Sequence, residues 1–390
     1  MQNKHLLVVP SVPVWENGDI LSFDRKFYDG ILLYLKDWPG QVSLFLSRSD
    51  SSLPDFGVVN KPINDIPFKC IIVNKDDAIT AGDLSGVSIV LASADADNQL
   101  HISALCGKSG IKCVYVIENI PKTRYQITLL STHNPFVLVR RFIYIWQQEK
   151  KRKLAFSISD GLQSNGTPAY FEYSTSKNNL LYFDTRVNKG NYITGDDLES
   201  RLADLSENKP LRLAFSGRLI HIKGADHLVK LALILKQRDI PFSFFIYGAG
   251  ELKDEMNVFI KKNQLDKHVF LLGPVDFYTR LLPDLQNNID LFVCLHRQSD
   301  PSCTYLETLS CGVPIVGYKN RAFDGLLTMA DIGWGAKIND IQKIADSIEY
   351  LGKNRTELYE KSRKALKFAR QHDFESTFQN RIKQLISLVE

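Results

Sequence analysis

The sequence lacks the features that would place it across a membrane or lead it out of the cell. No stretch of its 390 residues reaches the roughly 20 apolar residues that a membrane span requires. The opening MQNKHLLVVPSVPVW has a short apolar run and no small-residue cleavage site, so we expect no signal peptide.

Cysteine pairs and a strong charge imbalance are also missing. The six cysteines form no C-x-x-C pair and lie mostly inside apolar runs, as buried and reduced thiols do. The 48 basic and 44 acidic side chains leave a net charge of +4, which gives no reason to expect a nucleic-acid partner. Together these absences predict a cytoplasmic protein with buried thiols.

Length and hydrophobic pattern predict two α/β domains. Short apolar runs, such as Lys112–Ile117 and Leu211–Phe215, alternate with helical periodicity, which is typical of parallel sheets covered by helices. A polar stretch at 188–210 separates the two halves. We therefore predict a domain over 1–205, a second over 206–372 and a last helix within 373–390. Open α/β sheets bind ligands at the carboxyl ends of their strands, so we expect a cleft between the two domains.

Two strand-to-helix turns in the second half carry glycines and cations. Gly217 and Arg218 follow a predicted strand, and Lys223 precedes a predicted helix. Cations beside a helix N-terminus form a suitable cradle for a pyrophosphate, although two solvated loop cations would look the same. Gly248 opens a second turn, but Lys253 stands where a dinucleotide fingerprint has its third glycine.

A third segment predicts a buried carboxylate. Pro301 fits the first position of a helix, and Gly312 fits its end. The helix between them is mostly apolar or small, so Glu307 is expected to be buried and to need a partner. A ribose diol would serve, and so would a salt bridge.

In this order and spacing the three segments resemble the retaining family-4 glycosyltransferases of the GT-B class, also called glycosyl transferases group 1. The resemblance spans about residues 211–345 and includes G-R-L…K-G, the G-x-G-E turn and E-T-L-S-C-G-V-P-I-V-G. It implies an α/β fold of the GT-B type, with two Rossmann-like domains, a cleft between them and a last helix that crosses back to the first domain.

The same resemblance implies roles for individual residues. Arg218 and Lys223 would contact the phosphates of a nucleotide-sugar donor, and Glu307 would contact the nucleotide ribose. Gly217 and Gly248 belong to the donor-binding turns. Backbone amides of the loop before the helix would meet the sugar and phosphate, and this loop consists of Ser302, Cys303, Thr304 and Tyr305.

The sequence departs from the family pattern at three places. The usual first glutamate is replaced by Ser299, and Asp300, one place later, is our candidate for the sugar contact or else a helix cap. Glu118 stands where many members have a histidine, so it is either the base for the acceptor hydroxyl or a turn-capping acid. Gly18 lies where a Gly-Gly pair is usual, and it would allow close approach to the donor.

Breaking a sugar–phosphate bond leaves negative charge on the diphosphate. Fixed cations and amides stabilise that charge, so we expect no metal and no cofactor. The resemblance implies a UDP-linked donor. The single D-x-D, Asp95-Ala96-Asp97, is interpreted as turn and cap residues rather than a metal site.

The resemblance implies retaining transfer of a hexose to a glycan or lipid-linked glycan, most often in bacterial surface polysaccharide biosynthesis such as that of O-antigen. The alternative is a donor-binding GT-B partner or sensor without turnover, which the changes at Ser299 and Glu118 motivate. Bases mixed with aromatics at 140–153 predict either peripheral contact at the inner face of the membrane or a core-facing helix with a solvated basic end.

Overall fold

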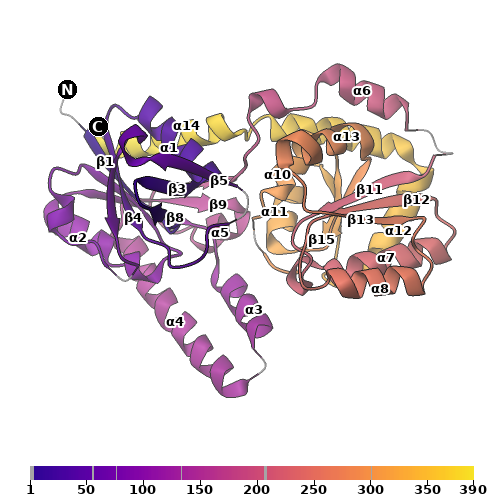
Figure 1. The fold of residues 1–390 in the computed structure, drawn as a ribbon, viewed down its shortest axis with the longest axis horizontal. Helices are drawn as coiled ribbons and strands as arrows, with labels where there is room; N and C mark the ends of the chain where they lie inside the picture. The colour runs from indigo at the N-terminus through magenta and orange to yellow at the C-terminus, as the bar shows by residue number, and fades with distance from the viewer. Residues whose placement is uncertain (1–3, 55–56, 76, 133, 206–208, 300) are drawn as a thin grey trace. The chain divides into compact units, whose positions relative to one another are not determined.

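The computed structural model describes residues 4–54, 57–75, 77–132, 134–205, 209–299 and 301–390. The chain forms two compact units (Figure 1). Unit 1 comprises Met1–Thr128, Thr132–Tyr182 and Glu375–Glu390, and unit 2 comprises Leu129–Ser131 and Phe183–Phe374. The domain boundaries expected from the sequence stay a prediction.

Unit 1 is built on a seven-stranded sheet in which every neighbouring pair is parallel. Chain order and spatial order differ, because the sheet grows outward from β1 first on one side and then on the other. This is the doubly wound order of Rossmann-like sheets. In spatial order the strands are β10 (Asn179–Tyr182), β9 (Gly161–Asn165), β8 (Lys112–Ile117), β7 (Ile89–Ser93), β1 (Lys4–Val9), β4 (Gly40–Ser47) and β6 (Lys69–Val73).

A small antiparallel sheet also belongs to unit 1. It pairs β2 (Trp15–Asn17) with β3 (Ile20–Asp24) and β3 with β5 (Val58–Pro62). Gly18 has a φ of 58° in the tight turn between β2 and β3, a conformation that glycine adopts without strain. The residues on either side of Gly18 therefore form a hairpin.

Two helices of unit 1 begin with a side-chain cap. The Asp24 side chain accepts a hydrogen bond from the Phe27 amide at the start of α1, and Asn134 does the same for Phe136 at the start of α4. Three short 3₁₀ turns, η1 (Ile63–Asp65), η2 (Gly82–Leu84) and η3 (Asp97–Gln99), lie in the connections. The α-helices are α1 (Arg25–Asp37), α2 (Ile102–Ser109), α3 (Pro121–Ser131), α4 (Pro135–Ile158), α5 (Gly166–Glu172) and α14 (Phe374–Val389).

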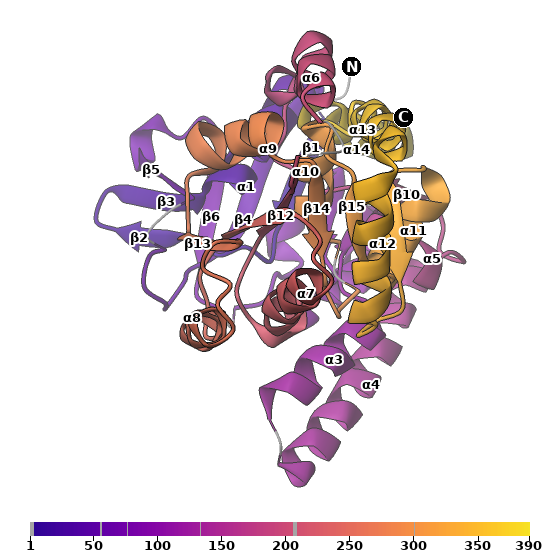
Figure 2. The same ribbon diagram turned by 90° about the vertical axis from the view of Figure 1, so that its right-hand side faces the viewer.

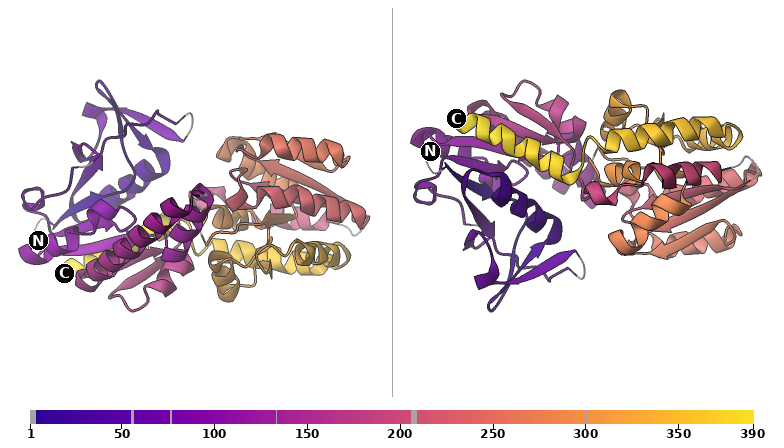
Figure 3. Two further views of the ribbon diagram at one scale, coloured as in Figure 1. Left: turned by 90° about the horizontal axis from the view of Figure 1, so that it is seen from below. Right: turned by 90° about the horizontal axis from the view of Figure 1, so that it is seen from above.

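The last helix, α14, packs on unit 1 (Figure 3). Arg381 donates from Nε to the Gln163 side chain at 2.7 Å, and the Gln163 amide donates to the Arg381 carbonyl at 3.1 Å. Phe378 meets Tyr34 of α1 edge to face, with ring centroids 5.5 Å apart. The helix expected from the sequence within 373–390 is confirmed.

Unit 2 repeats the doubly wound order with six parallel strands. The strand expected at Leu211–Phe215 is confirmed within one residue. In spatial order they are β13 (Val269–Gly273), β12 (Phe242–Tyr247), β11 (Leu211–Ser216), β14 (Leu291–Cys294), β15 (Ile315–Tyr318) and β16 (Gly333–Ala336).

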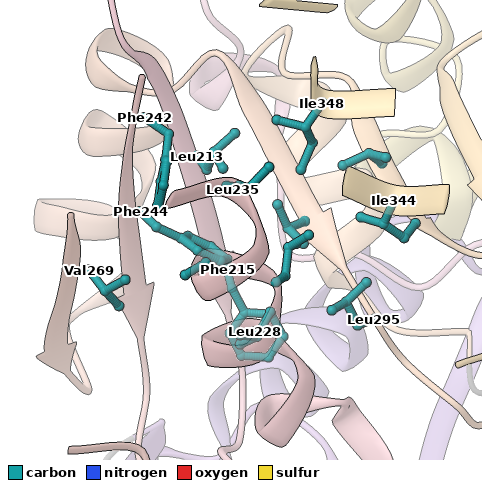
Figure 4. Packing of buried hydrophobic residues seen from close by; sticks show 14 of the residues in the cluster. Leu213, Phe215, Leu228, Leu235, Phe242, Phe244, Val269, Leu295, Ile344 and Ile348 are labelled. Atoms are coloured by element: carbon teal, nitrogen blue, oxygen red, sulfur yellow. The ribbon is translucent and has the colours of Figure 1, made fainter. Parts of the chain in front are cut away.

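Helices cover the sheet of unit 2, and its core lies between helix and sheet side chains. Figure 4 shows Phe215 and Phe244 from the sheet against Leu228 and Leu235 of α7. The helical segments are η4 (Lys189–Asn191), α6 (Gly195–Ala203), η5 (His221–Lys223), α7 (Ala225–Gln237), α8 (Lys253–Lys262), η6 (Phe277–Leu281), α9 (Leu282–Asn288), α10 (Thr304–Ser310), α11 (Arg321–Met329), α12 (Ile341–Lys353) and α13 (Arg355–Ala369).

Candidate functional site

The order of the strands in unit 2 indicates where a ligand binds. The strand order reverses between β11 and β14, which are hydrogen-bonded neighbours although β12 and β13 come between them in the chain. Open α/β sheets bind ligands outside the carboxyl ends of the strands at such a switch point. The loops that follow β11 and β14 contain most of the residues singled out in the sequence.

Glycines allow the loops of this edge to approach one another closely. Gly248 has a φ of 129°, and a Cβ atom built there would lie 2.0 Å from the Gly217 carbonyl oxygen. The Gly217 amide donates to the Tyr247 carbonyl at 3.1 Å, and the Leu219 amide donates to the Ala249 carbonyl at 2.8 Å. The turns after β11 and β12 therefore form one backbone surface that only glycine permits at residue 248.

Gly224 ends the η5 turn and joins it to the loop after β14. Its φ is 73°, and an added Cβ would lie 2.1 Å from the Leu295 carbonyl oxygen. The Arg297 amide donates to the Ile222 carbonyl at 2.9 Å, so the two loops at the switch point are tied together directly. Arg297 itself binds Asp226 through both terminal nitrogens, at 2.7 and 2.9 Å.

The two predicted phosphate-binding cations differ in their surroundings. Arg218 is exposed, whereas Lys223 is buried, with a relative exposure of 7%. The positive charge of Lys223 acts on His296, which lies just after β14 and is 1% exposed. Burial, reinforced by that charge, holds the pKa of His296 well below its ordinary value, so the imidazole is neutral. Neither ring nitrogen of His296 has a hydrogen-bond partner among the residues that the structure describes.

Glu307 is buried, as expected, and pairs with a cation. Its carboxylate accepts a hydrogen bond from Arg186 Nε at 2.7 Å. The Arg186 guanidinium also stacks over the Phe277 ring, 4.7 Å from its centroid. The salt bridge weighed from the sequence as the alternative to a ribose contact is thus present. An ion pair of this kind does not exclude a ribose contact, because a carboxylate has about four lone-pair sites.

The loop before α10 is only partly exposed. Ser302 and Thr304 hydrogen-bond through their hydroxyl groups at 3.1 Å, and the Cys303 thiol faces Asp184 at 3.7 Å. Tyr305 is buried and stacks on Phe323 with centroids 5.7 Å apart. Asp300, the candidate for the sugar contact, lies outside the described residues.

Asn320 and Ser299 attach the loop after β15 to this site. The Asn320 side-chain amide donates to the His296 carbonyl at 3.0 Å and to the Tyr305 hydroxyl at 3.2 Å. The buried Ser299 hydroxyl accepts from the Arg321 amide at 3.3 Å. The sequence reading gave no role to Arg186, His296 or Asn320. Arg186 and Asn320 lie outside the motifs quoted above, and His296 does not form part of a recognisable residue pattern. Nothing in the neighbouring sequence therefore indicates the contacts of these three residues.

Two of the predicted site residues belong to unit 1, whereas the donor residues of the loops after β11 and β14 belong to unit 2. Glu118 directly follows β8, at the carboxyl edge of the unit 1 sheet, and Gly18 lies in the β2–β3 turn. Asp95 accepts hydrogen bonds from the Glu118 and Asn119 amides at 2.8 and 3.1 Å. These contacts fix the turn after β8.

The D-x-D carboxylates have partners within unit 1. Asp95 also pairs with Arg124 at 2.6 Å, and Asp97 pairs with the fully buried Arg152 at 2.8 Å. In the described part of the chain, no group of three His, Cys, Asp or Glu side chains is arranged to hold a metal ion.

A sequence profile matches this half of the chain. The profile of glycosyl transferases group 1 aligns with residues 198–372, which include the loops after β11, β12 and β14. Residues 198–372 belong to the glycosyl transferases group 1 family. The region begins inside α6, whose Arg201 donates to the carbonyls of Cys311 and Gly312 at the end of α10.

Known proteins resemble this chain in part of its sequence or in its fold. A poly(ribitol-phosphate) alpha-N-acetylglucosaminyltransferase of Staphylococcus aureus (strain COL) is 26% identical over 101 residues, which are 26% of this chain and 20% of that protein's length. The structure of Anabaena Alr3699/HepE in complex with UDP superposes with a TM-score of 0.65 and 13% identity, over 99% of this chain and 100% of the other. WaaG, a glycosyltransferase involved in lipopolysaccharide biosynthesis, gives a TM-score of 0.59 and 11% identity, over 97% and 98%. The chain has the GT-B fold that the sequence predicted.

Proposed function

We propose that the chain is a retaining glycosyltransferase that takes a sugar from a UDP-linked donor bound at the carboxyl edge of the unit 2 sheet. The observation that carries this proposal is the pair of loops at the β11–β14 switch point, which hold Arg218 and Lys223 beside glycine turns. Cations and glycine backbone at such an edge suit a pyrophosphate. The Anabaena structural relative has been seen with UDP-glucose, which supports a uridine nucleotide.

In the proposed reaction the bond from the anomeric carbon to the donor phosphate breaks, and the diphosphate leaves with the electron pair. Arg218 and Lys223 stabilise that charge without a metal ion, and Glu307 holds the ribose. Removing one such preorganised contact costs about 10²-fold or more in rate. Glu118 takes the proton of the acceptor hydroxyl, which attacks on the face that preserves the anomeric configuration.

We propose a glycan or lipid-linked glycan as the acceptor, in bacterial surface polysaccharide biosynthesis. The staphylococcal relative is named for poly(ribitol phosphate), and WaaG is involved in lipopolysaccharide biosynthesis, which supports an acceptor of this kind. All six cysteines are free thiols, which supports a reducing compartment such as the cytoplasm.

A second candidate is a donor-binding partner or sensor without turnover. Ser299, at the position of the family's first glutamate, is buried and accepts a hydrogen bond from the backbone of α11. This position therefore offers no carboxylate to a sugar, which favours binding without transfer. Slow hydrolysis of the donor in the absence of acceptor separates the candidates, because a pure binder shows none.

Thermal unfolding with nucleotides and nucleotide sugars, in EDTA throughout, tests the donor site. A ligand at about 100 times its Kd adds about 2.7 kcal/mol to the stability of the folded state, which raises the melting temperature clearly. We expect UDP and one UDP-sugar to raise it, and Lys223→Met to abolish the rise. A panel that produces no rise would refute the donor site, and a rise that needs divalent metal would refute metal-independent binding.

A further inference from the structure

Helices α3 and α4 form a hairpin that extends from the body of unit 1 (Figures 1 and 2). Tyr125 of α3 packs edge to face on Phe142 of α4, with ring centroids 5.0 Å apart. With 24 residues, α4 is the longest helix in the described chain. None of the described helices is both long and apolar enough to cross a bilayer.

One face of α4 is anchored in unit 1. Ile145, Ala155 and Phe156 are buried there. Arg152 is fully buried and donates to Glu149 and to the Ala94 carbonyl, each at 2.8 Å. These contacts fix the rotation of α4 about its axis, and they therefore decide which residues face solvent.

The opposite face exposes a row of large apolar side chains. Their spacing of three, four or eight residues keeps them on one side of the helix. We call this row the α4 stripe; its members and exposures are Phe136 (85%), Val139 (60%), Ile143 (51%), Trp146 (53%), Leu154 (63%) and Ile158 (45%). An exposed apolar row of this length, interrupted at Lys150, marks an interaction surface, whereas scattered exposed apolar residues do not.

Positive charge lies within the stripe and along its borders. Arg140, Lys150, Lys151 and Lys153 are exposed on α4, and the Lys150 ammonium lies 3.6 Å from the centroid of the Trp146 ring. Residues 121–158 contain eight Lys and Arg but one acidic residue, Glu149, which is buried and paired with Arg152. The exposed surface of the hairpin therefore carries cations and apolar groups without an acidic side chain.

The excess of cations on the hairpin decides which partner the stripe can bind, a second copy of the chain or a lipid surface. A second copy packed through the same stripe would bring two sets of cations together without an acid on either side to pair with them. A bilayer with anionic headgroups offers apolar depth to the stripe and negative charge to its borders. Tryptophan beside lysine is typical of residues at the level of the headgroups.

We propose that the α4 stripe docks unit 1 on an anionic lipid surface, with α4 lying in the plane of the headgroups. Phe136, Ile143 and Trp146 enter the boundary of the acyl region, while Lys150, Lys151 and Lys153 contact the headgroups. This surface lies in unit 1, and the proposal does not depend on the donor site in unit 2.

Co-sedimentation of the full chain with vesicles tests the proposal. We expect binding to phosphatidylcholine vesicles that contain phosphatidylglycerol, and weak binding to phosphatidylcholine alone or in high salt. Lys150→Gln/Lys151→Gln/Lys153→Gln lowers partitioning on the order of 100-fold. Phe136→Ser/Trp146→Ser lowers it at least about tenfold, because apolar area no longer leaves water.

Matched variants on another exposed helix serve as controls. Lys253→Gln/Lys261→Gln/Lys262→Gln on α8 removes the same charge, and Val258→Ser removes an exposed apolar side chain there. Both should bind vesicles like the parent chain, and all variants should keep the parent's melting temperature. Equal binding to neutral and anionic vesicles, or equal loss in the α8 variants, would overturn the proposal. So would a concentration-dependent dimer that the Phe136→Ser/Trp146→Ser variant abolishes.

Tryptophan fluorescence locates the contact. Anionic vesicles should shift the emission of the parent chain to shorter wavelength, as an indole does when it leaves water. Trp146→Phe keeps the stripe apolar, so it should still sediment with the vesicles while losing the shift. If Trp146→Phe retains the full shift, another tryptophan meets the lipid, and the assignment to α4 is wrong.

Discussion

At the scale of single residues, the candidate site depends on a buried carboxylate with competing partners. Burial of Glu307 could be predicted from its apolar helix, because a charge there must be compensated. Its ion pair with Arg186 could not be predicted, since the two residues are 121 positions apart and share no motif. The same holds for His296, because nothing in the sequence indicates that its two ring nitrogens have no hydrogen-bond partner among the residues that the structure describes. Contacts between single residues distant in the chain depend on the assembled fold.

Nucleotides with and without ribose hydroxyls separate the two roles of Glu307. If the carboxylate binds the diol, Glu307→Gln should weaken UDP about 10- to 100-fold, the value of a charged hydrogen bond. It should leave 2′,3′-dideoxy-UDP unchanged, as measured by calorimetric titration. Arg186→Gln is the control, because it breaks the ion pair and leaves the carboxylate available to ribose. Equal weakening of both nucleotides would show that Glu307 serves only the salt bridge.

At the scale of elements, the strongly apolar strands and periodic helices were predictable, and the polar or short ones were not. Strand β9, Gly161–Asn165, is fully buried but contains Gln163, Ser164 and Asn165, so it has no hydrophobic signal. Its Gln163 and Ser164 side chains are satisfied by Arg381 and Asn179. Strands β2 and β3 have only three and five residues. The local hydrophobic pattern does not predict a strand where buried side chains are polar and form hydrogen bonds.

The turn between β12 and α8 provides a test at this scale. Gly248→Ala introduces a Cβ that meets the Gly217 carbonyl oxygen at 2.0 Å, in a backbone conformation that side chains rarely adopt. Strain and overpacking should lower the free energy of unfolding by about 2–5 kcal/mol and abolish the melting shift with UDP. Gly352→Ala in α12 meets no atom within 4 Å and should be neutral or stabilising. If the Gly248→Ala protein melts like the parent and still responds to UDP, the turns after β11 and β12 can move apart without loss of stability or of the donor site.

At the scale of the whole molecule, two doubly wound sheets arise from one repeated pattern, which is why the sequence predicted the fold class. The chain leaves unit 1 after Tyr182 and returns to it at Glu375, so α14 completes a unit that the chain left nearly 200 residues earlier. The contacts that hold it there join residues as far apart as Gln163 and Arg381. The resemblance to a family suggested this return; neither composition nor periodicity did.

A substitution at Arg381 tests whether the two units unfold independently of each other. Its guanidinium donates to the buried Gln163 and lies over the rings of Tyr182 and Phe378, at 4.4 and 4.9 Å from their centroids. Arg381→Met fills similar volume but leaves the Gln163 oxygen without its donor, which should destabilise unit 1 by about 2–4 kcal/mol. Calorimetry should therefore show an earlier transition for unit 1, while UDP still raises the transition of unit 2. Lys383→Met, on the exposed side of the same helix, should change neither. If Arg381→Met also removes the response to UDP, the donor site depends on an intact unit 1, and the units do not act independently.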